Sequence, residues 1–102
     1  MKVKKTNNAF KNCISLKNII LNDSLISIGN HVFENCNSLE EIIIPKNVNE
    51  IGYYAFETNS MKIYVYFNEN EIPEGWSTNW YKGDLEIHYG YEDSILVEEE
   101  KR

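Results

Sequence analysis

The side chains that could carry out chemistry are few in this chain. His31 and His88 lie far apart, and Cys13 and Cys36 lack the C-x-x-C spacing of a zinc site. The sequence contains no glycine-rich phosphate loop, no H-E-x-x-H metal motif and no G-x-S-x-G nucleophile motif. We therefore predict that the protein is not an enzyme and has no catalytic residue, no metal site and no cofactor.

The charge balance argues against a nucleic-acid partner. The 102 residues include 16 acidic and 10 basic ones, so the net charge is −6, and an acidic protein repels phosphate backbones. No apolar run approaches the roughly 18–20 residues that span a bilayer. Met1–Asn8 (MKVKKTNN) lacks the apolar stretch of a signal peptide. We expect no nucleic-acid partner, no membrane span and no signal peptide in this chain.

The two cysteines belong to a repeat of 23 residues, which is the main feature of the sequence. Residues 9–16 (AFKNCISL) align with residues 32–39 (VFENCNSL), and residues 55–59 (AFETN) begin a third copy at the same interval. Apolar residues coincide at further positions of this offset, namely Ile19/Ile42, Leu21/Ile44, Leu25/Val48 and Ile28/Ile51. A single short turn cannot bury its own apolar face, so the pattern predicts turns that stack on one another.

Each repeat position has a predicted structural role. The segment Leu39–Ile44 ends in the period-2 alternation of a short strand. Phe10, Phe33 and Phe56 are equivalent and should stack as an aromatic spine inside the core. Gly52, like Gly29 one copy earlier, marks a turn that needs backbone space or a positive φ.

The cysteines occupy the same position in successive turns of this stack. Cys13 and Cys36 are equivalent, and Asn59 takes their place in the third copy. We expect buried free thiols, since free cysteine is a common core residue. A disulfide between the stacked equivalents is the alternative.

The middle copy resembles a known repeat. Residues 38–56 (SLEEIIIPKNVNEIGYYAF) are similar to the BspA-type leucine-rich repeat, with the pattern L-x-x-I-x-I-P-x-x-V-x-x-I-G-x-x-A-F-x-x-C. The first copy carries Asn22 where the pattern has proline and Val32 where it has alanine, and the third copy lacks the I-P-x-x-V-x-x-I-G half. The resemblance implies an α/β leucine-rich-repeat solenoid, right-handed, with short parallel strands and mostly irregular or 3-10 connections.

The copies and the two ends predict four segments. Residues 1–8 form an N-terminal edge, 9–67 hold about three repeats, 68–91 form a C-terminal cap and 92–102 an acidic tail. The P-x-G-W-x-x-x-W segment that ends at Trp80 resembles the C-terminal closing element of BspA-like proteins. Trp76 and Trp80 would cover the last rung; a sugar-stacking platform is the alternative. Leu85, Ile87 and Tyr89 alternate as a final strand.

The N-terminal edge is less regular than the other end. Lys2 and Lys5 fall 23 residues before Leu25 and Ile28, and lysines cannot fill a core rung. The edge is therefore either polar, open to a partner or a second copy, or preceded by further repeats.

The outward side chains of the strands form the predicted binding face. If Ile19/Leu21, Ile42/Ile44 and Val65/Phe67 point inward, the residues pointing outward are Asn18, Ile20, Glu41, Ile43, Tyr64 and Tyr66. Neighbouring apolar side chains on an exposed face mark contact sites, and the predicted row is Ile20, Ile43 and Tyr66. A third copy shorter by one residue would pair Met61 with Leu39 and turn both tyrosines inward.

The predicted function is protein–protein interaction through this face. The resemblance implies an adhesion-type protein at the cell surface or secreted, which engages a host or matrix protein. Two alternatives remain from the sequence: a C-terminal capping piece of a longer repeat array or a self-associating unit, and a glycan-binding module.

Overall fold

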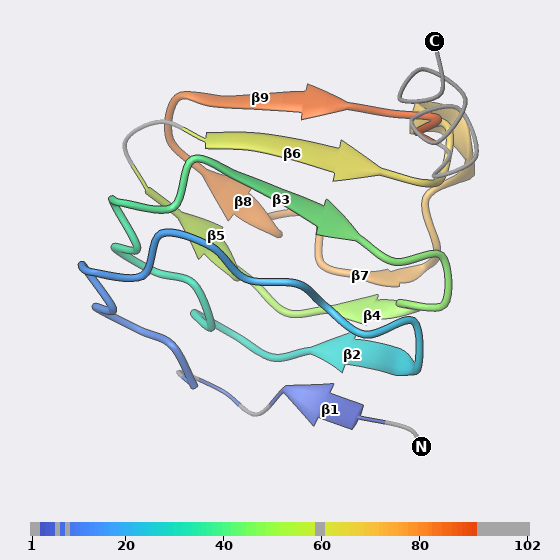
Figure 1. Ribbon diagram of the computed structural model, residues 1–102. Coiled ribbons are helices and arrows are strands. Elements are labelled where there is room, and N and C mark those ends of the chain that lie inside the picture. Colours follow the sequence, from blue (N-terminus) through green and yellow to red (C-terminus); the bar gives the residue numbers. More distant parts are fainter. Residues whose placement is uncertain (1–2, 6, 8, 59–60, 92–102) are drawn as a thin grey trace, which may run out of the picture.

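The computed structural model describes residues 3–5, 7, 9–58 and 61–91. These residues form short strands and one 3-10 helix, with no α-helix among them (Figure 1). The α component of the expected α/β class is therefore wrong for this part of the chain, while the expected parallel strands and irregular connections are confirmed. The elements are β1 Val3–Lys5, β2 Leu25–Ile28, β3 Glu41–Ile44, β4 Glu50–Ile51, β5 Phe56–Glu57, β6 Met61–Val65, η1 Glu69–Glu71, β7 Gly75–Trp76, β8 Tyr81–Lys82 and β9 Leu85–His88.

The strands form three parallel sheets, and from β3 onward the chain adds one strand to each sheet in a fixed order. The sheets have the orders β1-β2-β4-β7, β3-β6-β9 and β5-β8. Every pairing is between strands of successive turns, so each turn lies on the one before it, as Figure 1 shows for β3, β6 and β9. This arrangement follows from the repeat, because equivalent apolar positions are buried only when turns stack.

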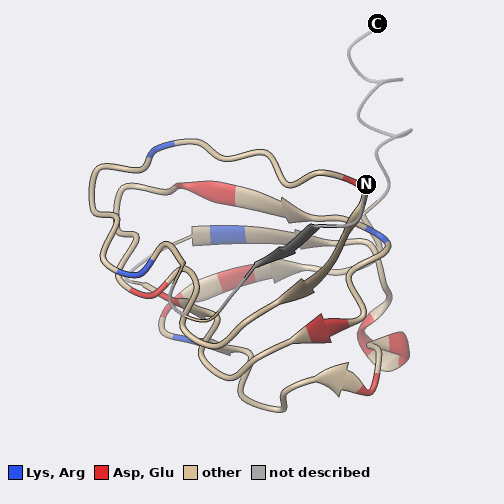
Figure 2. Ribbon diagram, turned by 90° about the horizontal axis from the view of Figure 1, so that it is seen from below, with Lys and Arg blue, Asp and Glu red and all other residues tan. Residues whose placement is uncertain are grey.

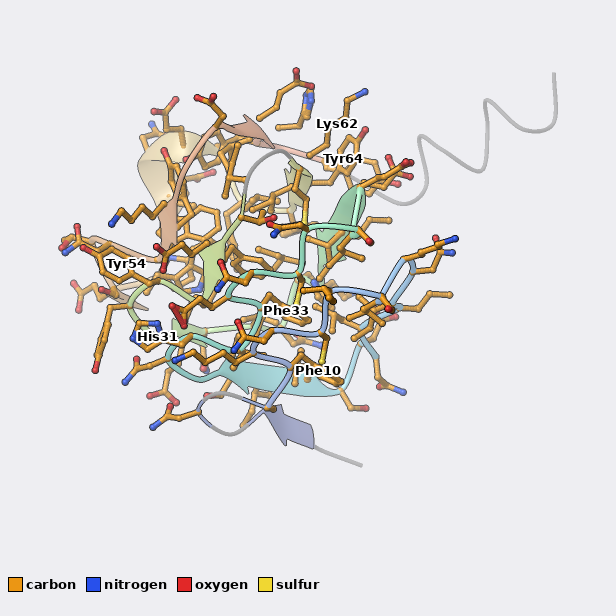
Figure 3. All side chains as sticks on the ribbon, turned by 90° about the vertical axis from the view of Figure 1, so that its left-hand side faces the viewer. Phe10, His31, Phe33, Tyr54, Lys62 and Tyr64 are labelled. Atoms are coloured by element: carbon orange, nitrogen blue, oxygen red, sulfur yellow. The ribbon has the colours of Figure 1, made fainter. Side chains whose placement is uncertain are left out.

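The aromatic spine is present as predicted. The rings of Phe10 and Phe33 are stacked with centroids 5.5 Å apart and planes 6° apart, and Phe33 and Phe56 follow at 5.1 Å and 16°. Figure 3 shows Phe10 and Phe33 one above the other. Trp80 then meets Phe56 edge-on, at 5.9 Å and 90°. The spine thus runs through three turns and ends against the tryptophan.

The core lies between the three sheets and is almost entirely apolar. Alternation along β3 explains how it forms, since Ile42 and Ile44 are buried while Glu41 and Ile43 are exposed. The core consists of Leu21, Leu25, Ile28, Val32, Phe33, Cys36, Leu39, Ile42, Ile44, Val48, Ile51, Ala55, Phe56, Met61, Ile63, Val65, Trp76 and Trp80.

The third copy has a different register from the one predicted. Ile42 pairs with Ile63 and Ile44 with Val65, an offset of 21 instead of 23. Neither the 23-residue register nor the version shorter by one residue is correct. Ile63 and Val65 are nevertheless buried, because side chains alternate with period 2 and a loss of two residues keeps each one on its face.

The first copy also departs from the expected pattern. Residues 17–22, which match the strand segment of the second copy, form no strand. Leu21 is buried and Ile19 is half-buried, so the inward side chains point as predicted. The sheet containing β3 therefore begins at β3 and not at this segment.

The turn after β4 needs backbone space, as predicted for its glycine. A Cβ on Gly52 would lie 2.0 Å from Oδ1 and 2.6 Å from N of Asn30. This oxygen accepts a hydrogen bond of 2.9 Å from the backbone N–H of Tyr53. The Asn30 N–H in turn donates to Oδ1 of Asn7 at 2.8 Å, so asparagines link successive turns.

The two ends of the stack are built differently. At the N-terminal end, β1 pairs with β2, and a register shift after Val3 places Val3 opposite Leu25 and Lys5 opposite Ile28. At the other end, Trp76 and Trp80 are 5% and 6% exposed. Burial leaves no open indole face, so these side chains do not form a sugar-stacking platform. The 92–102 tail lies outside the described residues.

Candidate functional site

The outer face of the β3-β6-β9 sheet presents two rows of side chains. The first row crosses the strands as Glu41, Lys62 and Glu86. Figure 2 shows the same order, with one basic position between two acidic ones on neighbouring strands. Opposite charges on adjacent strands attract modestly at an exposed surface. This row is the polar side of the face.

The second row is apolar and aromatic. Ile43 pairs with Tyr64, and Tyr64 pairs with His88 on the next strand. The rings of Tyr64 and His88 are stacked with centroids 5.0 Å apart and planes 17° apart, and Tyr91 lies 5.1 Å from Tyr64. Ile43 is 38% exposed and Tyr64 is half-buried. The row offers flat ring surface beside an exposed aliphatic side chain.

Tyr66 lies outside this row. The 21-residue offset places Tyr64, and not Tyr66, beside Ile43. Tyr66 is 44% exposed and packs edge-on against Phe67 with ring centroids 5.5 Å apart. The predicted outward orientation of both tyrosines is correct, whereas the predicted neighbours Ile43 and Tyr66 are not adjacent.

Asn18 and Ile20 lie beyond the edge of the sheet. Both are exposed, and Ile20 reaches 96% exposure. A cleft of about 630 Å³ separates their segment from β3. Its lining consists of Asn18, Ile19, Ile20, Leu21, Asn22, Asp23, Glu41, Ile42, Ile43 and Pro45. Two of the predicted site residues thus form one wall of a cleft, and Glu41 and Ile43 lie on the other.

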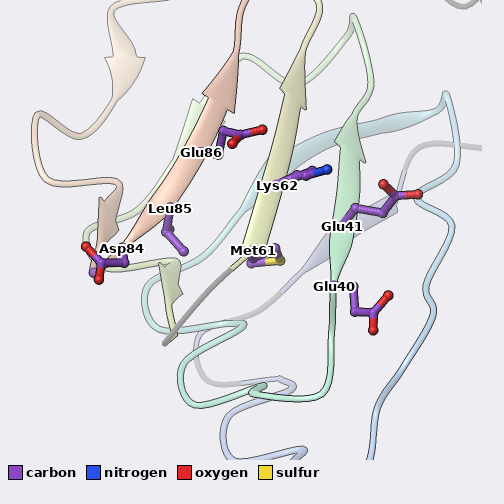
Figure 4. Close-up of a pocket in the computed structure, with 8 residues that line it drawn as sticks. Glu40, Glu41, Met61, Lys62, Asp84, Leu85 and Glu86 are labelled. Atoms are coloured by element: carbon purple, nitrogen blue, oxygen red, sulfur yellow. The ribbon is translucent and has the colours of Figure 1, made fainter.

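A second hollow, of about 770 Å³, lies at the start of the three strands (Figure 4). Four carboxylates surround a single lysine there, so the hollow is acidic. It is lined by Glu40, Glu41, Met61, Lys62, Gly83, Asp84, Leu85 and Glu86. Sequence reasoning missed Asp84 and Glu86, because the segment after Phe67 carries no repeat pattern. It missed Lys62 because the 23-residue register did not place Lys62 beside Glu41. The alternation of Leu85, Ile87 and Tyr89 was the available signal that Glu86 and His88 face outward.

A ladder of charged side chains crosses successive turns and ends on the sheet of β5 and β8. Lys11 Nζ is 3.3 Å from Glu34 Oε2, and Lys82 Nζ is 3.8 Å from Glu57 Oε2. His31 Nδ1 lies 3.3 Å from the same Glu34 oxygen. One atom each from His31, Glu34 and Glu57 fall within 4.8 Å of one another, as metal ligands would. The two lysines already balance the two carboxylate charges, so we interpret the group as an ion-pair ladder between turns.

His31 lies in a turn between β2 and β3. Its φ is 57°, and the equivalent Tyr54 has a φ of 49°. The two rings meet at 61° with centroids 5.9 Å apart, as Figure 3 illustrates. Tyr53 contacts the His31 ring from another side at 5.1 Å. The histidine is thus held between repeat turns among aromatic and acidic neighbours.

Both cysteines are free thiols, as predicted. Cys36 is buried, and its Sγ–H donates to the backbone oxygen of Phe10 at 3.0 Å. Burial raises the pKa of the Cys36 thiol, because the low-dielectric core disfavours the thiolate. Cys13 is only partly buried. The buried Cys36 thiol therefore lacks the accessible surroundings of a reactive cysteine.

The fold and this surface define a repeat protein with an open sheet face. The model of the BspA type Leucine rich repeat region (6 copies) matches residues 4–76. The chain therefore belongs to the BspA-type leucine-rich-repeat family. Searches of curated proteins and of solved structures gave no significant match. Among the described residues, no helix is long and apolar enough to cross a membrane.

The family places the chain among repeat modules that generally act in protein–protein interaction and not in catalysis. The matched region begins within β1 and ends at Trp76 in β7. It thus includes strands from all four successive turns that contribute to the β1-β2-β4-β7 sheet.

Proposed function

We propose that this protein is a non-catalytic solenoid that binds another protein through the exposed face of the β3-β6-β9 sheet. The observation that supports the proposal is the row of Ile43, Tyr64 and His88, with Tyr91 against Tyr64. The row is more apolar and aromatic than an ordinary solvated face. The polar row beside it would supply the charged rim.

Physical chemistry favours a protein partner on this face. Tyrosine contributes large contact area at a low cost in side-chain entropy and is enriched in interfaces. Stacking on His88 holds the Tyr64 ring in place before a partner arrives, so less freedom is lost on binding. Exposed Ile43 at its side adds area that is unfavourable in water.

The finer form of the proposal is adhesion at a cell surface. The partner would be a host or matrix protein that contacts Asn18, Ile20, Glu41, Ile43, Tyr64 and Tyr66. This part comes from the family resemblance and from the exposed positions of these residues.

The test uses matched substitutions on and off the face. Ile43→Asp and Tyr66→Asp place a charge on the proposed surface. Tyr53→Asp is the control, because Tyr53 is 49% exposed and Tyr66 44% exposed, and it follows β4 in another sheet. Binding of the protein to a panel of purified extracellular-matrix proteins is measured by surface plasmon resonance, and thermal unfolding checks each fold.

We expect the two substitutions on the face to weaken binding by about tenfold or more, as a lost interface contact of about 1.4 kcal/mol would. The control should bind as the unaltered protein does. Equal binding by all three variants would contradict the proposal that the partner binds through this face. Failure of the unaltered protein to bind any matrix protein would refute the adhesion function.

A second candidate is self-association or addition to a longer repeat array at the first turn. The observation that favours it is Ile14, which is 62% exposed beside the half-buried Cys13 and Leu16. An apolar end of this kind is what a stacked neighbour would cover. Light scattering across a range of concentrations decides it, since a constant monomer mass would exclude self-association.

The glycan-binding alternative loses its main support. Because the indoles of Trp76 and Trp80 are buried, only the exposed tyrosines could stack against a sugar among the residues considered for this role. No separate observation favours a sugar at these tyrosines.

A further inference from the structure

We propose that the outer edge of β3 accepts an extended peptide segment of a partner protein, bound in the cleft between β3 and residues 17–22. The segment would be apolar and carry lysine or arginine. It would add to the β3-β6-β9 sheet as a further strand. The proposal concerns backbone groups at the sheet edge. The cleft shares Asn18, Ile20, Glu41 and Ile43 with the contact residues proposed above, but Tyr64 and Tyr66 are not part of it.

The first observation is the direction of the β3 backbone groups. Lys62 N–H donates to the Glu40 oxygen at 3.0 Å, and Glu41 pairs with Lys62. In a parallel ladder this pattern directs the N–H and C=O of alternate residues to the same neighbour. The N–H and C=O groups of Glu41 and Ile43 therefore point away from β6, toward the cleft.

The second observation is that the opposite wall leaves these groups unpaired. Within the described ranges, no backbone hydrogen bond joins residues 17–22 to β3. Side-chain hydrogen bonds join the two walls at the two ends of the cleft. Ser38 Oγ donates to the Ile14 oxygen at one end, and Asn47 Nδ2 donates to the Asp23 oxygen at 3.0 Å at the other. A strand edge with free donors and acceptors is a template for another chain.

The lining of the cleft selects the occupant. Aliphatic side chains and a proline make up most of it, and Ile20 and Ile43, one from each wall, are exposed. Its only charged side chains are Asp23 and Glu41, and both are acidic. A peptide that alternates apolar and basic residues would satisfy both features, because successive side chains of a strand point to opposite faces.

The size of the cleft sets the length of the segment. The edge offered by β3 is four residues long, or about 13 Å at about 3.3 Å per residue. A segment of four to six residues would therefore pair along the whole edge, by roughly the same rise. Its backbone would form hydrogen bonds with Glu41 and Ile43, and Ile20 would cover it from the opposite wall.

Two other occupants are possible outcomes of the test. Residues 17–22 carry Ile19 and Leu21 at the positions of Ile42 and Ile44, so this segment could close onto β3 in solution. A second copy of the chain could also pair edge to edge.

The experiment is a titration of isotope-labelled protein with two synthetic octapeptides, followed by NMR. One alternates lysine with valine, and the control alternates glutamate with valine. We expect the lysine peptide to shift the amide signals of Glu41 and Ile43 and to slow their hydrogen exchange. The glutamate peptide should do neither, because Asp23 and Glu41 repel it.

Substitutions at one position separate the backbone from the charge. Glu41→Pro removes the outward N–H, which an edge strand tolerates, and should weaken binding of the lysine peptide by about tenfold. Glu41→Gln keeps the N–H and removes only the charge, so we expect a loss of about two- to threefold. Tyr66→Asp should leave peptide binding unchanged, which separates this site from the proposed face.

Three results would overturn the inference. Slow exchange of the Glu41 and Ile43 amides in the free protein, as slow as that of Ile63, would show that residues 17–22 already pair with β3. Shifts of these amides with protein concentration alone would identify a second copy as the occupant. Equal shifts with both peptides, or none, would exclude a basic strand. These readouts use the unaltered protein, so they hold even if Glu41→Pro does not fold.

Discussion

Replacing Phe33 by alanine should destabilise the protein much more than the same change at Phe10, the first ring of the aromatic spine. Phe33 is fully buried and stacks on Phe10 and on Phe56. Truncating a buried phenylalanine costs about 3–5 kcal/mol, and each aromatic pair accounts for about 0.5–1.5 kcal/mol beyond burial. Since two pairs are lost, we expect the upper part of this range, about 4–5 kcal/mol.

The same reasoning gives a smaller value for the first ring. Phe10 is only half-buried, so Phe10→Ala should cost about 2 kcal/mol, well below the range for a fully buried ring. Phe33→Leu keeps most of the volume and should cost under about 2 kcal/mol. A chain of this length has a total stability of about 5–15 kcal/mol. Phe33→Ala therefore brings it near the limit of folding.

Urea unfolding followed by tryptophan fluorescence measures these differences. Trp76 and Trp80 are buried at the far end of the stack, so their emission reports loss of the packed core. The midpoint and slope give the free energy of unfolding for each variant. Equal costs for Phe10→Ala and Phe33→Ala would refute the reasoning, as would a cost below about 1.5 kcal/mol for Phe33→Ala, less than one stacked pair plus burial.

Three further predictions concern the thiols, the pH dependence and the turn. Iodoacetamide should modify Cys13 in the folded protein and Cys36 only after unfolding, as mass spectrometry would show; modification of both at one rate would contradict the burial of Cys36. Burial raises the pKa of Cys36 and of Tyr89, so above about pH 8.5 the unfolded chain loses protons first. The free energy of unfolding should then fall as pH rises; Cys36→Ala should reduce this slope, and an unchanged slope would exclude the thiol as a cause. Gly52→Ala should cost about 1–3 kcal/mol by crowding, since its Cβ would lie 2.0 Å from Asn30 Oδ1; a melting temperature equal to that of the unaltered protein would show that Asn30 moves aside.

The sequence was sufficient to predict the spine and the stacked parallel strands. Identical side chains recur at one offset through Phe10, Phe33 and Phe56, and only stacking buries them all. The register of the third copy was not predictable by the same reasoning. Offsets of 21 and 23 both place Ile63 and Val65 inside, because the two differ by one full period of a strand.

The cleft and the aromatic row were beyond sequence reasoning for a different reason. Residues 17–22 match the strand pattern, so the sequence predicts a strand where the structure has an unpaired segment. His88 completes the row with Tyr64, yet it lies after Phe67, where no repeat specifies which strand is adjacent. Backbone pairing across turns depends on loop lengths, and these are not encoded in the alternation of side chains.

The edge-on contact of Trp80 with Phe56 ends the series of parallel rings. A ring that presents its edge at 90° cannot continue a parallel stack to another phenylalanine. A duplicated 23-residue cassette inserted behind Trp80 would therefore find no matching surface for its own phenylalanine. Lengthening of such a protein at this end, by engineering or by gene duplication, would first require removal of the tryptophan.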